Sequence, residues 1–214
     1  MTKAGTIDGR LARGERTRVT VLDAAVQLAS ERGLNGLSLS QLADHLGVSK
    51  SGLFAHWRSK EELQLATVAR AREQWIEQIV RPALTAPRGV RRLWAAHERR
   101  LAFYAARTLP GCCFFANAEF EYGARPGPVR DQLAAALAEW LGLVERLAAE
   151  AVAAGDLPAT VDPARLAFEV DAMGVATVMQ GRLLDAAAVQ RTARAAVLGR
   201  LRGLCTDPAL LPEA

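Results

Sequence analysis

The 214-residue sequence has few cysteines, no long apolar run and no pattern of β-strands. Cys112, Cys113 and Cys205 are too few for a disulfide scaffold, and none has the C-x-x-C spacing of a zinc or redox site. No stretch approaches the roughly 18 apolar residues of a membrane-spanning helix, and the first 18 residues lack the apolar segment of a secretory signal. Period-two alternation is also missing. These absences predict a cytoplasmic, all-α protein with reduced thiols and no membrane partner.

Positive charge is concentrated at the start of the chain. The net charge is +4, and residues 1–60 hold nine basic and five acidic side chains, whereas the remainder holds eighteen of each. All three lysines, Lys3, Lys50 and Lys60, lie in this first segment. A localised basic surface is typical of polyanion binding, although a solvated tail has the same composition. Residues 1–16, basic and glycine-rich, are expected to form a flexible arm.

Helical periodicity predicts three helices next, at residues 17–32, 39–46 and 50–57. Ser38 and Gln41 form a capping box ahead of the second helix, Gly47 ends it, and Ser49 caps the third. Two short helices joined by a tight turn after a longer helix are typical of a helix-turn-helix, whose second short helix enters the major groove of DNA.

The predicted recognition helix has a buried side and an exposed side. If Leu53 and Trp57 face the core, Lys50, Ser51, Phe54, Ala55 and His56 project toward solvent or DNA. Gly52 permits a close approach of the backbone, and the positive helix N-terminus favours phosphate oxygens. A helical hairpin that only supports a core would show the same inward leucines, so this pattern leaves that alternative open.

Six further helices are expected, at residues 60–80, 90–109, 112–122, 129–154, 163–184 and 187–204. The first should begin at the capping box of Ser59 and Glu62 and stop before Pro82, because proline breaks helices. The last two carry small or apolar residues on broad faces, which one subunit cannot bury alone. They predict a homodimer through a two-fold four-helix bundle. The expected interface residues are Val170, Gly174, Thr177, Val178, Gly181, Val189, Ala193, Val197 and Leu201.

Residues 17–66 resemble the DNA-binding domain of the tetracycline repressor (TetR) family, above all in the run LADHLGVSKSGLFAHWRSKEEL at 42–63. The motifs LPGCCFF at 109–115 and RPGPVR at 125–130 resemble one subtype of the family's C-terminal domain. The resemblance implies a helix-turn-helix domain at 17–62 and a helical ligand-binding and dimerisation domain at 63–206. It implies a sequence-specific transcriptional regulator without a cofactor, a repressor released from double-stranded operator DNA by a small hydrophobic or amphipathic effector.

The resemblance also assigns individual roles in DNA binding. Lys50 matches the lysine that opens the recognition helix and contacts backbone or base edges. His56 and Lys60 match positions at phosphates, and Ser38 and Ser40 match positions that touch the opposite backbone. The remaining expected contacts are Ser49, Ser51, Gly52 and Phe54.

The recognition helix departs from the family's pattern at two positions. Phe54 and Ala55 stand where the family often has tyrosines. Because phenylalanine has no hydroxyl group to donate to a phosphate, Phe54 is expected to contact a thymine methyl group or a sugar instead.

Most large side chains lie in the second half of the chain, in the helices that enclose the ligand in the TetR family. The expected ligand-binding residues are Trp94, His97, Leu101, Tyr104, Phe114, Phe115, Asn117, Phe120, Trp140 and Met173. Glu119 and Glu121 are further polar candidates. Pockets are lined mainly by apolar and aromatic groups, but the same residues can simply fill a core, and that alternative stays open.

A thiol-based enzyme or redox sensor using Cys112 or Cys113 is the alternative function, with His97 and Glu98 as candidate base and orienting group. No catalytic signature surrounds these residues, and adjacent cysteines on a helix point about 100° apart. The three histidines are scattered along the chain, so no metal site is expected.

Overall fold

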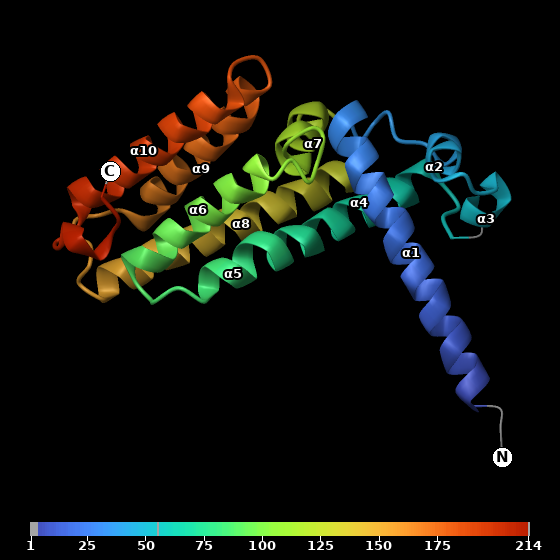
Figure 1. Cartoon of the computed structure of the whole chain (residues 1–214), viewed down its shortest axis with the longest axis horizontal. Helices are drawn as coiled ribbons and strands as arrows, with labels where there is room; N and C mark the ends of the chain where they lie inside the picture. Colours follow the sequence, from blue (N-terminus) through green and yellow to red (C-terminus); the bar gives the residue numbers. More distant parts are fainter. Residues whose placement is uncertain (1–3, 55, 214) are drawn as a thin grey trace. The chain divides into compact units, whose positions relative to one another are not determined.

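The computed structural model describes residues 4–54 and 56–213, with side chains from Thr17 onward. Every regular element in this part of the chain is a helix (Figure 1), which confirms the all-α prediction. The elements form two compact units. Unit 1 comprises the residues up to Glu73 together with residues 109–133, and unit 2 comprises residues 74–108 together with the chain from Ala134 onward. No helix in the described ranges is long and apolar enough to cross a membrane.

Unit 1 holds the predicted helix-turn-helix. Its helices are α1 (Ala4–Arg32), α2 (Leu39–Leu46), α3 (Lys50–Phe54), most of α4 (Lys60–Trp75), α7 (Phe114–Tyr122) and the start of α8 (Pro128–Ala153). Helix α1 packs against both α2 and α7, and α2 packs against α3. A segment that the sequence assigned to the ligand-binding domain, residues 109–133, therefore packs with the DNA-binding helices.

Local sequence signals set the ends of the short helices as predicted. The Ser38 hydroxyl accepts a hydrogen bond from the Gln41 N–H at 3.2 Å and caps α2. Gly47 has φ 65° and ends α2 in the left-handed conformation, which glycine adopts without steric cost. The Ser59 hydroxyl accepts from the Glu62 N–H at 3.0 Å at the start of α4.

The first helix is longer than the sequence predicted. Its backbone is helical from Ala4, whereas residues 1–16 were expected to form an arm outside the helix; Met1–Lys3 lie outside the described residues. The three glycines that suggested an arm each weaken a helix by about 1 kcal/mol. An existing helix nevertheless extends at low cost, and no proline stops it.

The helix that was expected to end before Pro82 continues through it. A π-helical turn at Ile76–Val80 follows α4, and α5 (Arg81–Leu84) follows the turn. The N–H of Arg81 donates to the carbonyl of Ile76, five residues back, so the hydrogen-bond ladder shifts by one residue next to the proline. Because Pro82 has no N–H to donate, this shift lets the chain stay helical.

Unit 2 contains the π turn, α5, α6 (Val90–Ala105), the larger part of α8, α9 (Pro163–Gly181), α10 (Ala186–Leu204) and a short 3-10 turn (Pro208–Leu210). Helix α9 packs against α6 and α10. The Asp162 carboxylate accepts from the N–H groups of Ala164 and Arg165 at 3.0 and 3.2 Å and so caps the N-terminus of α9.

Candidate DNA-binding site and buried polar cluster

Helix α3 turns its predicted DNA-contacting side chains to solvent. Leu53 and Trp57 are 3% and 0% exposed, so the opposite side of α3 faces outward, as the sequence predicted. The Ser49 hydroxyl accepts from the Gly52 N–H at 3.3 Å and caps this helix. We use the name DNA face for the predicted contact residues Ser38, Ser40, Ser49, Lys50, Ser51, Gly52, Phe54, His56 and Lys60. All of them are exposed except the half-buried Ser38 and Ser40.

Phe54 is the large apolar side chain of the DNA face. It is 52% exposed, although most of its neighbours on this surface are polar. An aromatic ring held in water without a protein partner suits an apolar contact with a base methyl group. Ala55, the second departure from the family's pattern, lies outside the described residues.

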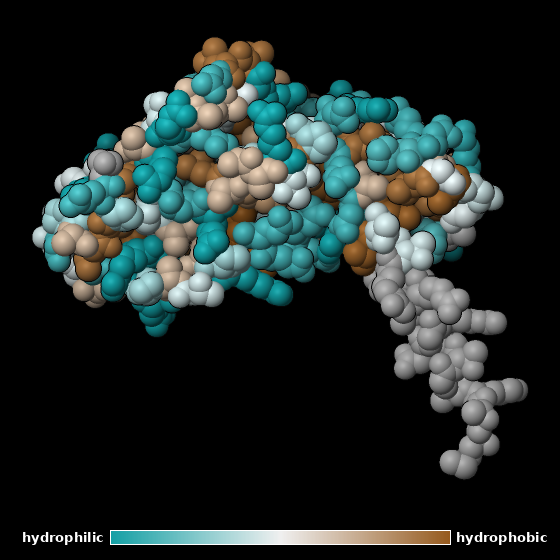
Figure 2. Space-filling view, viewed as in Figure 1, coloured by the Kyte–Doolittle hydropathy of each residue, from teal (hydrophilic) through white to brown (hydrophobic). Residues whose placement is uncertain are grey.

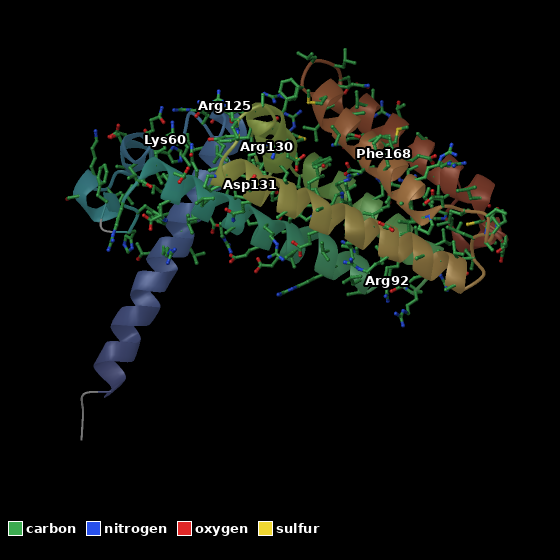
Figure 3. The ribbon with its side chains drawn as sticks, turned by 180° about the vertical axis from the view of Figure 1, so that it is seen from behind. Lys60, Arg92, Arg125, Arg130, Asp131 and Phe168 are labelled. Atoms are coloured by element: carbon green, nitrogen blue, oxygen red, sulfur yellow. The ribbon has the colours of Figure 1, made fainter. Side chains whose placement is uncertain are left out.

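Lys60, labelled in Figure 3, belongs to a chain of hydrogen bonds that the sequence did not reveal. Its ammonium group donates to the carbonyl oxygen of Asn35, in the turn between α1 and α2. The N–H of Asn35 in turn donates to the Glu121 carboxylate of α7, at 3.1 Å from each oxygen. Glu121 was expected among the polar pocket residues, and 86 positions separate it from Asn35, so no local pattern could pair them.

A further cation of unit 1 was missed by sequence reasoning. The guanidinium carbon of Arg18 lies 5.9 Å from the ring centroid of Trp57, within the range of a cation–π contact. Arg18 is exposed on α1. Arg18 adds positive charge to the compact unit that carries the DNA face. The excess of basic residues before position 61 is the sequence feature that could have pointed to Arg18.

Unit 2 buries an ion pair. Arg100 of α6 is 1% exposed, and its Nη1 lies 2.8 Å from Oδ1 of Asp171 on α9. Its Nη2 donates to the Val170 carbonyl, and the Trp140 indole N–H donates to the same Asp171 oxygen at 2.8 Å. Gly174 leaves room for the guanidinium, since a Cβ there would lie 1.9 Å from its central carbon. Because 71 positions separate Arg100 from Asp171, no local pattern of the sequence indicated this pair.

His97 is fully buried in the same unit. Apart from the Ala193 backbone, its ring nitrogens face no hydrogen-bond partner, and the Trp94 ring centroid lies 5.9 Å from its own. Burial, together with the positive charges of Arg100 and Arg194, lowers the pKa of His97 to about 3, although a hydrogen bond with the Ala193 backbone acts in the opposite direction. The ring is therefore neutral near pH 7 and can donate one hydrogen bond and accept another.

The burial of His97 should make stability depend on pH. An unfolded-state histidine keeps a pKa near 6.5, so between pH 6.5 and about 3 the unfolded chain binds a proton that the folded chain does not. We expect stability to fall by up to about 1.4 kcal/mol per pH unit as pH drops through this window, and to be independent of His97 above it. Urea unfolding of His97→Leu should show a shallower dependence. The exposed His45 offers the control His45→Gln, which should retain the wild-type slope; equal slopes for His97→Leu and wild type would contradict the expectation.

The predicted ligand-binding residues divide between the two units. Those in unit 2 are the buried Trp94, His97, Leu101, Tyr104 and Trp140 and the exposed Met173. Those in unit 1 are Phe114, Phe115, Asn117 and Phe120 of α7. The Asn117 amide donates to the Ser30 and Gly111 carbonyls, each at 3.1 Å, and Phe120 is 82% exposed. The five buried residues of unit 2 lie within its core, whereas Met173 lies on its surface.

An aromatic cluster occupies the core of unit 2. The Trp75 ring centroid lies 5.2 Å from that of Trp140, 6.1 Å from Phe103 and 6.5 Å from Tyr104. The first two pairs meet edge to face, which is a favoured geometry for aromatic rings. Trp75 was not among the predicted pocket residues, although its side chain joins three helices of the unit.

The predicted dimer residues mostly lie inside the protomer. The buried ones are Val170, Gly174, Thr177, Val178, Ala193, Val197 and Leu201, while Gly181 and Val189 are half-buried. They lie on helices that pack against each other and against α6. The prediction therefore placed these seven residues at an interface, whereas they form the intramolecular face of α9 and α10. The surface that a partner can reach is the opposite one.

The residues suggested for thiol chemistry have structural contacts instead. Cys113 is 2% exposed and caps α7, its sulfur accepting from the Ala116 N–H at 3.5 Å. Glu98 pairs with Arg194 at 2.9 Å, and His97 is enclosed in unit 2. Among the residues with described side chains, no three histidine, cysteine, aspartate or glutamate groups come together as a metal site. These contacts give the thiol alternative no support.

Two family models match the chain. Residues 21–67 match the model described as bacterial regulatory proteins of the tetR family, and residues 89–197 match the model described as a tetracyclin repressor-like C-terminal domain. The two matches separate at the segment that contains the π turn and α5. They cover the helix-turn-helix and most of the remaining helices.

Curated relatives are similar in sequence over part of their length. The chain is 36% identical over 89 residues to the HTH-type transcriptional activator FasR of Mycolicibacterium smegmatis, which covers 42% of the chain and 40% of FasR. It is 26% identical over 152 residues to the HTH-type transcriptional regulator SrpR of Pseudomonas putida, covering 71% of the chain and 68% of SrpR. The FasR match therefore spans less than half of that relative.

Solved structures share the fold over nearly the whole chain. A TetR transcriptional regulator from Chloroflexus aurantiacus superposes with a TM-score of 0.84 at 25% identity, covering 91% of this chain and 98% of that one. AibR, in a complex with isovaleryl coenzyme A and operator DNA, gives a TM-score of 0.67 at 22% identity and covers 84% and 97%. The second likeness concerns the fold alone.

Proposed function

Because this chain belongs to the tetracycline repressor (TetR) family of transcriptional regulators, we propose that it is a homodimeric repressor whose DNA face binds an operator. The observation that carries the proposal is the helix-turn-helix itself: Leu53 and Trp57 are buried, and Lys50 opens the exposed side of α3. Since FasR is named an activator, a promoter reporter with and without this protein tests the sign of regulation. On this proposal the protein acts in the cytoplasm, where bacterial operator DNA lies.

Variants of the two lysines test the DNA face. Lys60→Ala removes a phosphate contact and should weaken binding to all sequences alike, lowering the slope of log affinity against log salt by about one. Lys50→Ala should cost about 1–3 kcal/mol on the operator if this side chain reads a base edge. Fluorescence anisotropy with operator and scrambled duplexes across a salt series measures both effects.

The control for these variants removes a cation from unit 2. Arg99 is exposed on α6, and Arg99→Ala should leave operator affinity and its salt slope unchanged. If both lysine variants keep the operator affinity of the wild type and its slope of log affinity against log salt, the assignment of the DNA face is wrong.

The proposed dimer uses the outer surface of α9 and α10. Phe168 (Figure 3), Val175 and Met179 are 70%, 38% and 41% exposed and lie on one side of α9 at near-heptad spacing. Leu183 and Leu184 extend this apolar surface beyond the helix, at the apolar cap that Figure 2 shows where α9 passes into α10. Exposed apolar side chains gathered on one side of a helix are a feature of protein interfaces.

Helix α10 offers small residues beside that patch. Ala195, Ala196, Gly199 and Gly203 are exposed, and a Cβ added at Gly199 or Gly203 would meet nothing within 4 Å. Small side chains let helices approach closely, so a two-fold related α9 can pack here. A symmetric dimer of two protomers would present two recognition helices to successive major grooves, roughly 34 Å apart.

Charge introduced on α9 should break the dimer. Val175→Glu places a carboxylate in the proposed interface, so we expect a dimer at micromolar concentration to become a monomer in sedimentation velocity, with operator affinity falling in parallel. Ala69→Glu, which changes an exposed alanine of α4, is the control and should remain dimeric. A monomeric wild type, or a dimeric Val175→Glu, would contradict this interface.

Unit 2 is the proposed effector site. Its support is the aromatic cluster around Trp75 together with the buried, neutral His97 ring, because small-molecule sites combine apolar walls with a few polar groups. The structure of AibR contains an acyl coenzyme A and operator DNA in one complex. By linkage, an effector that weakens operator binding must itself bind more weakly to the protein–operator complex, typically by about 1–3 kcal/mol.

Operator affinity measured across a panel of hydrophobic ligands, with Trp140→Ala as the comparison, tests the proposed effector site. A ligand that is confirmed to bind but leaves operator affinity unchanged would exclude coupling for that ligand.

A further inference from the structure

We propose that Glu121 of α7 is a positioning residue for operator binding, acting through Asn35 to hold the Lys60 ammonium group where it meets a DNA phosphate. The inference rests on the proposed function, since it takes Lys60 as a phosphate contact. It assigns to α7, which lies outside the helix-turn-helix sequence, an indirect part in DNA binding.

The hydrogen bonds run in one direction along this chain of groups. The Lys60 ammonium donates to the Asn35 carbonyl, and the Asn35 N–H donates to both oxygens of the Glu121 carboxylate at 3.1 Å. The peptide dipoles on the two sides of Asn35 are thus fixed by Lys60 and Glu121 together. Hydrogen bonds with an ionised partner are stronger than neutral ones, so both ends of this chain are charge-assisted.

The turn that carries Asn35 is shaped to receive the carboxylate. Gly33 has φ +85°, and a Cβ added there would lie 3.1 Å from one Glu121 oxygen and 3.2 Å from the other. The Gln64 side chain of α4 holds the neighbouring Leu34 carbonyl at 2.9 Å. The turn is therefore fixed by α4 from one side and by α7 from the other.

Helix α7 is itself held against α1 in unit 1. The Asn117 amide donates to the Ser30 carbonyl at 3.1 Å, and the Gly111 N–H donates to the Ser30 hydroxyl at 3.4 Å. These bonds set the position from which Glu121 reaches the turn, one helical turn beyond Asn117. If α7 shifts relative to α1, Glu121 moves with it, and the shift changes the position of Asn35 and therefore of the Lys60 ammonium group.

The arrangement leaves Lys60 able to bind DNA. An ammonium group has three N–H donors, and the bond to Asn35 uses one of them. The remaining donors can meet phosphate oxygens while the flexible four-carbon side chain stays restrained. A restrained lysine loses less conformational entropy on binding than a free one, which is the energetic benefit of the Glu121 contact.

The charge of Glu121 and its positioning role predict opposite changes in operator affinity when Glu121 is replaced, so the direction of the measured change distinguishes them. Removing a carboxylate from unit 1 reduces repulsion of DNA, so an electrostatic effect alone would tighten operator binding. Loss of positioning weakens it. We expect Glu121→Gln and Glu121→Asp each to weaken operator affinity roughly five- to tenfold, because each breaks or lengthens the charge-assisted bond to Asn35.

The experiment is a double-mutant cycle measured by fluorescence anisotropy on the full chain and its operator. In the Lys60→Ala background, Glu121→Gln should not weaken binding further, because the residue through which it acts is gone, and the lost negative charge should leave affinity unchanged or slightly higher. Glu31→Gln, which removes an exposed carboxylate from the last turn of α1, is the matched charge control and should bind as tightly as wild type or slightly tighter. Thermal melts establish that all variants are folded at the assay temperature.

Each outcome has a defined meaning. If wild type does not prefer the operator over scrambled DNA, the proposed function fails. If Lys60→Ala binds as wild type, Lys60 is not a phosphate contact and the inference falls with that assignment. If both of those hold, an unchanged or tighter Glu121→Gln overturns the positioning role alone. An equal loss with Lys60 present and absent would show that Glu121 acts on the fold, and would overturn it as well.

Discussion

Replacing Gly111 by alanine is expected to destabilise the protein by about 3 kcal/mol or more. A Cβ on Gly111 would lie 1.6 Å from the backbone carbonyl oxygen of Ser30 in α1, and a helix backbone cannot give way as a side-chain tip can. The added methyl group would separate Gly111 from Ser30 and break the hydrogen bonds that Asn117 makes to both residues. Urea unfolding should therefore show a much lower midpoint for this variant.

The control for Gly111→Ala changes a glycine where space is available. Gly142 lies within α8, and a Cβ there would meet only a terminal nitrogen of the Arg146 side chain, at 3.3 Å. Gly142→Ala should be neutral or stabilising by up to about 1 kcal/mol, because alanine favours the helix. Equal urea midpoints for Gly111→Ala and wild type would show that residues 109–113 do not pack against α1 as described.

Arg100→Met is the second variant with a large expected effect. It removes the partner of Asp171 and of the Val170 carbonyl inside unit 2 and leaves a carboxylate largely buried without its counter-ion. Breaking one side of a buried ion pair costs about 3–5 kcal/mol, so the urea midpoint should fall sharply while unit 1 keeps its own contacts. The Trp140 indole would be the remaining donor to Asp171.

The double variant Arg100→Met with Asp171→Leu separates the charge effect from the loss of packing. With both charges gone, no unpaired ion remains, and apolar side chains of similar size can fill the space. We expect most of the stability lost in Arg100→Met to return. A double variant no more stable than the single one would mean that the ion pair contributes by its shape and hydrogen bonds and not by charge compensation.

The helix-turn-helix could be predicted because its signals are local. Ser38, Gly47 and Ser59 act within one turn of the helix ends that they define, and the structure places each as the sequence indicates. The side of α3 that faces the core could be predicted in the same way from Leu53 and Trp57, which are both buried. Such features depend on the chain's own neighbours along the sequence, so reading residues in order was sufficient.

The face of α9 was beyond such reasoning, because apolar residues surround the helix. Val170 and Val178 lie inside the protomer, while Phe168 and Val175 lie outside, and hydrophobic periodicity alone cannot choose between two apolar sides. The choice depends on Arg100, which needs Gly174 and Asp171 facing inward. That contact joins residues 71 positions apart, so it appears only when the helices are placed in space.

The central claim, that this protein binds a specific operator sequence as a dimer, is tested most directly by its binding to DNA from its own upstream region. Fluorescence anisotropy and sedimentation should be carried out with that duplex and with a scrambled duplex of the same composition, over a series of salt concentrations. We predict two protomers bound to a site with dyad symmetry, at least about a thousandfold more tightly than to scrambled DNA, and with affinity that falls steeply as salt rises. Equal affinity for the two duplexes, or a complex containing one protomer, would contradict the claim.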